Sequence, residues 1–311
     1  MNDENKFSIE DEIDLRKLFT AFLNKKILIV SLTSFFAISA IIISLLIPNQ
    51  YQSFTVVAPI NNSAQQIGGS ISTSALGGLA SLAGIDLPNE GVSEAKIAIQ
   101  VMQSWGFIEQ FIKRNNLEKY LVAVVGWDSK NDELIYDDGI FDSNKNIWIE
   151  SKPSSWALYK AFRNRLSVEE DLKTGMTTIS FKYFSPTISK DMIQLLIQDI
   201  NNFMKERKLE TVDRSIIYLQ EQINKTIIKD MENIFYQIIA EQTKSKMLAE
   251  ATPEYTFVTI SKPMVPQEKS EPTRSLIVII STIIGFLFSL VTAIILSLRE
   301  GFSLQPDNNV K

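Results

Sequence analysis

Two long apolar segments lie near the two ends of the chain, and the residues between them are mostly polar. Residues 27–47 and 275–298 contain no charged side chain. A bilayer core of about 30 Å requires about 20 apolar residues in a helix, so each segment is long enough to cross a membrane. Buried core helices of soluble proteins seldom stay uncharged over such a length. We therefore predict two transmembrane helices, 27–47 and 275–298.

A cleaved signal peptide is the alternative reading of the first apolar segment. Residues 1–26 carry charges of both signs, and the apolar run exceeds the ~15 residues of a usual signal-peptide core. Residues 48–51, directly after the apolar run, contain no small-x-small cleavage pattern, and the apolar run continues past the weak candidate Ala37-Ile38-Ser39. An uncleaved anchor is therefore expected.

The basic residues predict the orientation of this anchor. Four of them precede the first span: Arg16, Lys17, Lys25 and Lys26. No Lys or Arg occurs from residue 48 to residue 95. Because Lys and Arg are enriched on the cytoplasmic side, we expect both tails (1–26 and 299–311) in the cytoplasm and residues 48–274 outside it.

The pattern between the spans indicates a mixed α/β domain. Residues 51–60 are β-branched and aromatic and predict a strand. Residues 166–172 and 176–184 alternate around a turn at 173–175 and predict a strand pair, and residues 255–260 predict a closing strand. Between the first two strands, a Gly-rich stretch at 61–91 predicts a loop with a short helix at 76–83, followed by a helix from Ser93 onward. Residues 118–150 look irregular.

The longest predicted element follows Ser185 and Pro186, which together mark a helix start. No Gly or Pro occurs from residue 187 to residue 252, so a single helix there would be about 100 Å long. Apolar residues at helical spacing, among them Ile216, Ile223 and Ile227, form a stripe along it. Such a stripe requires a partner helix, and self-association is the simplest one. One rod and a folded-back pair both fit; polar residues 241–246 are a candidate bend.

A proline-rich linker joins this domain to the second span. Pro263, Pro266 and Pro272 precede Arg274, and proline prevents helix continuation, so the linker should be extended. Within the span, Gly285 and Ser289 form a small-xxx-small pair that permits close helix contact.

Composition removes several function classes. The chain has 31 Lys and Arg against 36 Asp and Glu, a net charge of −5, and neither Cys nor His. Disulfide frameworks, zinc clusters, cysteine nucleophiles and Ser-His-Asp triads are therefore excluded, and nucleic-acid binding is not expected. No cofactor or metal site is expected. Asp137 and Asp138 could form an acid/base pair, but neighbours in sequence point to different faces, which favours a solvated loop. Three tryptophans, Trp127, Trp148 and Trp156, could stack on sugar rings, but they are interpreted as packing residues.

Several short segments, in this order and between two spans, resemble the Wzz-type chain-length determinants, or polysaccharide co-polymerases. These segments are Asp14-Leu15, Pro48, Tyr51-Gln52-Ser53, 76–85, Tyr183-Phe184-Ser185-Pro186, 215–219, 247–249, Tyr255, Phe257 and Pro272-Thr273-Arg274.

The resemblance implies an α+β, membrane-anchored protein: an extracytoplasmic α/β base, a long helical protrusion (about 186–252) and a ring-like homo-oligomer in the bacterial inner membrane. It implies a non-catalytic regulator of O-antigen or related glycan length, working with a separate polymerase on undecaprenyl-linked units. It also implies that the proline-rich segment and the two spans are characteristic elements of the family. In this chain they contain Pro263, Pro266, Pro272 and Gly285.

Three alternatives remain at this point. An adaptor for a separate cytosolic kinase or capsule exporter would act through the two tails. A two-span sensor would need a cytoplasmic signalling module, which the short tails cannot supply. A periplasmic hydrolase would depend on Asp137 and Asp138. An autokinase is not expected, since residues 299–311 carry no P-loop and no tyrosine cluster.

Overall fold

The computed structural model describes residues 25–60, 93–149 and 151–303, with side-chain burial given as far as residue 296. The described residues form two compact units, one of residues 25–48 with 271–303 and one drawn from residues 49–270. The predicted short helix at 76–83 lies outside the described residues.

The first unit contains two long apolar helices that pack side by side, α2 (Lys26–Leu46) and α11 (Arg274–Ser303). Most of their side chains are exposed, including Phe35 and Leu45 on α2 and Ile279 and Phe288 on α11. Lys26–Leu46 and Arg274–Leu296 are both long and apolar enough to cross a bilayer. Two such helices near the termini fit a two-span membrane protein.

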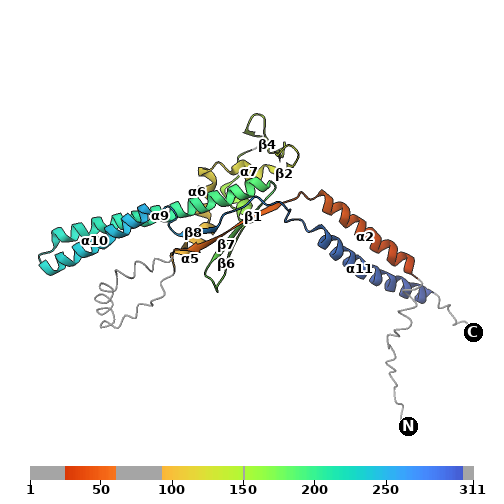
Figure 1. Cartoon of the computed structure of the whole chain (residues 1–311). Helices are drawn as coiled ribbons and strands as arrows, with labels where there is room; N and C mark the ends of the chain where they lie inside the picture. Colours follow the sequence, from red (N-terminus) through yellow and green to blue (C-terminus); the bar gives the residue numbers. More distant parts are fainter. Residues whose placement is uncertain (1–24, 61–92, 150, 304–311) are drawn as a thin grey trace, which may run out of the picture. The chain divides into compact units, whose positions relative to one another are not determined.

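The second unit is built on a four-stranded antiparallel sheet with the strand order β6-β7-β1-β8 (Figure 1). Its strands are β1 (Tyr51–Pro59), β6 (Leu166–Glu170), β7 (Thr177–Tyr183) and β8 (Phe257–Ser261). All four were expected near these positions. The order of the strands in the sheet was not expected, because β1 pairs with β7 and β8, which come much later in the sequence of the domain.

The β6–β7 pair agrees with the predicted hairpin. Val168 pairs with Ile179, and Asp171 N donates to Met176 O at 2.9 Å to close the turn. Gly175 has a φ of 69°, in the left-handed region that glycine occupies without strain. The alternation of the sequence therefore gives the correct register here.

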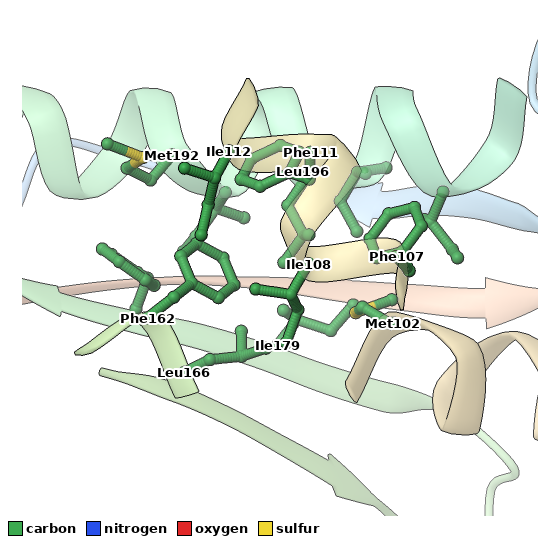
Figure 2. Close-up of a cluster of buried hydrophobic side chains, with 14 of the residues drawn as sticks. Met102, Phe107, Ile108, Phe111, Ile112, Phe162, Leu166, Ile179, Met192 and Leu196 are labelled. Carbon is green, nitrogen blue, oxygen red and sulfur yellow. The ribbon is translucent and has the colours of Figure 1, made fainter. Parts of the chain in front are cut away.

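One face of the sheet is covered by helices, and the hydrophobic core lies between them (Figure 2). The helices are α5 (Glu94–Gln103), α6 (Trp105–Arg114), α7 (Glu118–Val122), α8 (Ser155–Arg163) and the first part of α9 (Pro186–Lys225). Ile108 and Phe111 of α6 meet Ile179 of β7 and Leu196 of α9, all at most 1 % exposed. Fully burying each such side chain contributes about 1.5–3 kcal/mol, so this cluster is the main source of stability of the unit.

The single helix expected from Ser93 onward is in fact two. Ser104 separates α5 from α6: its Oγ accepts from Phe107 N at 3.4 Å and donates to Val101 O at 2.6 Å. This serine therefore caps the second helix and turns the chain, although the apolar spacing continues across it.

The segment predicted to be irregular contains short elements. After α7 come β2 (Val124–Asp128), β3 (Glu133–Tyr136), β4 (Phe141–Asp142) and β5 (Ile147–Trp148), paired as two small hairpins. The expectation of an irregular segment was wrong, because strands this short leave little periodicity to read.

The long helical stretch folds back on itself. α9 ends at Lys225, α10 (Lys229–Ala251) begins four residues later, and the two helices pack along each other (Figure 1). Lys246 Nζ lies 2.7 Å from Asp213 Oδ1 across the pair. The structure therefore has the folded-back form, and the bend is at residues 226–228. The candidate bend at 241–246 was wrong, since these residues are helical within α10.

The fold class expected from the sequence is confirmed. A mixed helix and sheet domain is carried in sequence between two apolar helices, and a helical hairpin extends from its core helix α9.

Candidate functional site

The proline-rich linker runs beside the start of β1. Ser53 Oγ donates to Met264 O at 2.7 Å, and Ser270 N donates to Gln50 O at 2.8 Å. Pro263 and Pro266 are half-buried, whereas Met264 is 76 % exposed. Residues 262–270 therefore form an irregular segment with a bend at 267–268, held to the start of β1 by these two hydrogen bonds, with the apolar Met264 side chain exposed.

The remaining linker residues belong to the other unit. Pro272 lies just before α11, and Arg274 is the first residue of that helix. Pro263 and Pro266 are thus not brought together with Pro272 and Arg274 in one compact unit.

Gly285 and Ser289 both face α2. A Cβ atom at Gly285 would lie 2.6 Å from Phe36 Cβ, closer than real Cβ contacts, so only glycine permits this approach of the helices. One turn further on, Ser289 is fully buried, and its Oγ lies 3.4 Å from Thr33 Oγ1. The pair noted in the sequence lies at the contact between α2 and α11.

Three hydroxyl groups along this contact donate hydrogen bonds to backbone carbonyl groups of the two helices. Ser289 Oγ donates to Phe286 O at 2.7 Å, Thr33 Oγ1 donates to Ile29 O at 2.7 Å, and Ser281 Oγ donates to Phe36 O at 3.4 Å. Satisfying these groups internally is what a lipid environment requires.

The predicted apolar stripe is only partly available for a partner. Ile216 and Ile223 are half-buried against the hairpin, and their stripe neighbours Val212 and Leu219 are at most 8 % exposed. Ile227, in the bend, is 97 % exposed. α10 therefore supplies part of the partner surface that the sequence assigned to a second copy, and Ile227, the most exposed residue of the stripe, lies at the tip.

The candidate acid/base pair lies in a tight turn. Asp137 Oδ1 accepts from Gly139 N at 2.9 Å, as in an Asx-turn, and Asp138 is exposed. Within the described residues, no group of three or more metal-ligating side chains occurs.

Each of the three tryptophans considered lies against another aromatic ring. Trp127 meets Tyr51 edge-on at 5.5 Å between ring centroids, and Trp148 meets Phe141 at 5.2 Å. Trp156 is 60 % exposed and lies beside Tyr159. Packing accounts for the first two.

The half-buried Arg165 and the buried Tyr183 stabilise the core without forming a reactive site. The Arg165 guanidinium lies over the Tyr183 ring at 5.6 Å and donates to Leu121 O at 2.7 Å. Burial raises the pKa of Tyr183, and its hydroxyl donates to Tyr120 O at 2.7 Å. Both groups have hydrogen-bond partners, so they fasten β7 to the helices around α7.

A cleft of about 660 Å³, which the sequence did not predict, lies between α9 and β8. We call it the α9 cleft. Its α9 wall carries Lys190, Gln194, Gln198, Asn202 and Lys205; Thr55 and Thr259 come from the sheet; and Glu254, Lys262 and Pro263 form the opposite wall. Its volume lies in the ~300–1,000 Å³ range of small-molecule sites. The polar residues of α9 that line the cleft recur every three or four positions. This spacing places them on one face of the helix, but the prediction from the sequence rested on the apolar residues of the same helix instead.

The walls of the α9 cleft are fixed by a buried asparagine. Asn201 Oδ1 accepts from Thr256 N at 2.8 Å and from Phe257 N at 2.9 Å, and Asn201 Nδ2 donates to Phe257 O at 3.0 Å. Glu254 Oε1 accepts from the Thr259 hydroxyl at 2.8 Å. These contacts hold the strand against the helix and leave the neighbouring amides and ammonium groups facing the cleft.

Fold and surfaces together define a class of protein: an α/β domain with a helical hairpin, held in sequence between two helices of membrane-spanning length. Residues 11–114 match the family model described as Wzz, the chain length determinant protein. This match confirms the resemblance noted from the sequence. A comparison with curated protein sequences finds no match.

Two solved structures are among those similar to this chain. A full-length bacterial polysaccharide co-polymerase is 10 % identical with a TM-score of 0.38, over 95 % of this chain and 100 % of that one. A fragment of WzzB, a polysaccharide co-polymerase from Salmonella Typhimurium, is 12 % identical with a TM-score of 0.31, over 72 % of this chain and 100 % of that one.

Proposed function

We propose that this chain is a non-catalytic membrane protein that regulates the length of a bacterial surface polysaccharide, such as O-antigen, together with a separate polymerase. The family match over residues 11–114 is the observation that carries the proposal. The two apolar helices and the domain between them are consistent with it.

The proposed arrangement places the domain of residues 49–270 in the periplasm and both tails in the cytoplasm. It rests on the basic residues before the first span and on the absence of Lys and Arg from residue 48 to residue 95. In this arrangement, the extracytoplasmic domain is on the side where lipid-linked repeat units would be joined.

Assembly into a homo-oligomer is part of the proposal. Exposed apolar side chains at the end of the helical hairpin, Ile227 at 97 % and Ile228 at 62 %, would be covered by neighbouring copies. An oligomer would present many copies of the domain to one growing glycan or polymerase. The proline-rich segment, with Pro263 and Pro266, is a candidate surface for the polymerase because Met264 projects from it.

A gene deletion followed by an electrophoretic glycan ladder tests the function. We expect the deletion to change the modal length of the glycan without abolishing polymerisation, and the intact gene to restore it. An unchanged ladder would overturn the proposal. Loss of exported polymer with unchanged length would instead support the adaptor function for a kinase or exporter.

A further inference from the structure

The α9 cleft has a local charge opposite to that of the whole chain. Three ammonium groups, Lys190, Lys205 and Lys262, line it against the single carboxylate of Glu254. Glu254 Oε1 is engaged by both the backbone N and the hydroxyl of Thr259. In a chain of net charge −5, this surplus of positive charge indicates an anionic occupant.

Two of the three lysines are available to such an occupant. The third, Lys190, is paired: its Nζ lies 3.4 Å from Asp191 Oδ1. For Lys205 and Lys262, no ion pair is found within the described residues, and the Lys205 side chain is half-buried. A partly desolvated ammonium group binds an anion more strongly than a fully hydrated one, because the local dielectric constant is lower.

The amides between the lysines point to the rest of the ligand. Gln194, Gln198 and Asn202 follow one another at four-residue intervals on the same face of α9. A carboxamide both donates and accepts, as a sugar hydroxyl does, so each can pair with a hydroxyl in either sense. The residues lining the cleft include no aromatic ring. Recognition would thus depend on hydrogen bonds and charge rather than on stacking.

The length of the polar row favours a chain over a single small anion. From Lys190 to Lys205 the helix rises about 22 Å, at about 1.5 Å per residue. One phosphate would engage one end of this row only. A linear saccharide of several rings would reach both ends and the amides between them.

We propose that the α9 cleft binds a carboxylate-bearing saccharide chain, with the amides of α9 pairing with its hydroxyls and Lys205 and Lys262 with its carboxylates. The biological source of that chain rests on the proposed function, since a length regulator must meet its glycan. The chemistry of the cleft, however, is argued from its side chains alone.

Binding is tested on the full chain purified in detergent, by isothermal titration with tetragalacturonic acid at about 0.15 M salt, where surface charges are already screened beyond ~8 Å. We expect saturable binding to the acid and much weaker binding to its methyl ester, which keeps the hydroxyls and removes the charge. The double variant Lys205→Gln/Lys262→Gln should weaken binding about tenfold or more, because two charge-assisted hydrogen bonds are lost.

A matched control separates the cleft from general charge effects. Lys229→Gln/Lys244→Gln removes the same charge from exposed positions of α10 outside the cleft, and binding should stay within about twofold of the wild type. Equal losses in the two double variants would overturn the proposal, as would equal binding of acid and ester. Binding of inorganic pyrophosphate but not of the saccharide would make the cleft a phosphate site and overturn it as well.

Two further readouts keep the outcomes distinct. If the cleft were instead an interface between copies, Lys205→Gln/Lys262→Gln would reduce the oligomeric mass in detergent without any saccharide binding by the wild type, and the proposal would fail. If the gene deletion changes the glycan ladder while no saccharide binds, this inference fails and the proposed function stands. If the saccharide binds and the deletion leaves the ladder unchanged, the proposed function fails and the binding of a saccharide in the α9 cleft stands.

Discussion

Asn201 and Phe257 are joined by a two-way amide pairing: the carboxamide of Asn201 accepts from Phe257 N at 2.9 Å and donates to Phe257 O at 3.0 Å. The Asn201 side chain thus acts as an additional strand residue at the β8 edge of the sheet. The same oxygen also accepts from Thr256 N at 2.8 Å. Asn201 is 3 % exposed, so water cannot replace these bonds.

Replacing this asparagine should destabilise the domain. Asn201→Ala leaves two backbone N–H groups and one carbonyl buried without their partner, and we expect a loss of about 2–4 kcal/mol in the free energy of unfolding. Urea unfolding of the full chain in detergent, followed by tryptophan fluorescence, measures it. Asn202→Ala, at the next position on the surface of α9, should change stability by no more than about 0.5 kcal/mol. Equal effects of the two changes would contradict the structural role of Asn201.

The sequence predicted best the elements whose periodicity is long or regular. The two apolar helices, the β6–β7 hairpin around Gly175 and the helix start at Ser185 and Pro186 all follow from local patterns. The pairing of β1 with β7 and β8 does not, because strand order depends on contacts between residues far apart in the chain. The α9 cleft was missed for the same reason: α9 and β8 meet only in the folded domain.

The bend of the helical hairpin was missed because it contains neither Gly nor Pro. Thr226, Ile227 and Ile228 are three successive β-branched residues, and Thr226 and Ile228 have extended backbone angles. β-branched side chains lose χ1 freedom in a helix, which weakens the helix where three of them adjoin. Asp230 and Glu232 then favour a new helix start, since negative charge stabilises the first turn.

The contact between Gly285 and Phe36 predicts a size limit at position 285. Gly285→Leu should separate α2 from α11, because even a Cβ atom would lie 2.6 Å from Phe36 Cβ; overpacking of this kind costs about 1–3 kcal/mol. The chain has no cysteine, so the pair Thr33→Cys and Ser289→Cys, where the native oxygens are 3.4 Å apart, reports the contact by disulfide formation in native membranes.

The disulfide yield should fall in Gly285→Leu and persist in Ile283→Ala, which alters a side chain that is 55 % exposed. Adding Phe36→Ala to Gly285→Leu should restore part of the yield by making room for the new side chain. A full yield in Gly285→Leu alone would show that the helices do not depend on this close approach.

The ion pair between Lys246 and Asp213 predicts a weakening of the hairpin at alkaline pH. The hydrogen bond that Lys246 Nζ donates to Asp213 Oδ1 raises the pKa of Lys246 above its ordinary value of 10.5. Because the folded pKa is the higher one, the stabilisation is fully present below the unfolded pKa and is lost as pH rises through the folded pKa. Between about pH 9 and about pH 12, the urea midpoint of the helical circular dichroism signal should therefore fall more in the wild type than in Asp213→Asn.

The Asp213→Asn variant serves as the control for the wild type at each pH, because tyrosine ionisation and other alkaline effects occur in both proteins. Equal falls of the midpoint would mean that the pair adds nothing to the hairpin. Because both side chains are partly exposed, added salt should reduce the difference between the two proteins.

The exposure of the hairpin tip predicts that one residue of the apolar stripe, Ile227, contributes to assembly but not to the fold of the chain. Ile227 is 97 % exposed, so Ile227→Asp should leave the helical content of the chain unchanged and lower the oligomeric mass measured by light scattering in detergent. The reason is that a carboxylate covered by a neighbouring copy would be desolvated without a partner. Ile223 is half-buried in the hairpin, so Ile223→Asp should weaken both assembly and the fold. Asn224→Asp adds the same charge at a neighbouring exposed position and should change neither. If Ile227→Asp and Asn224→Asp have the same mass as the wild type, the tip is not part of the interface between copies.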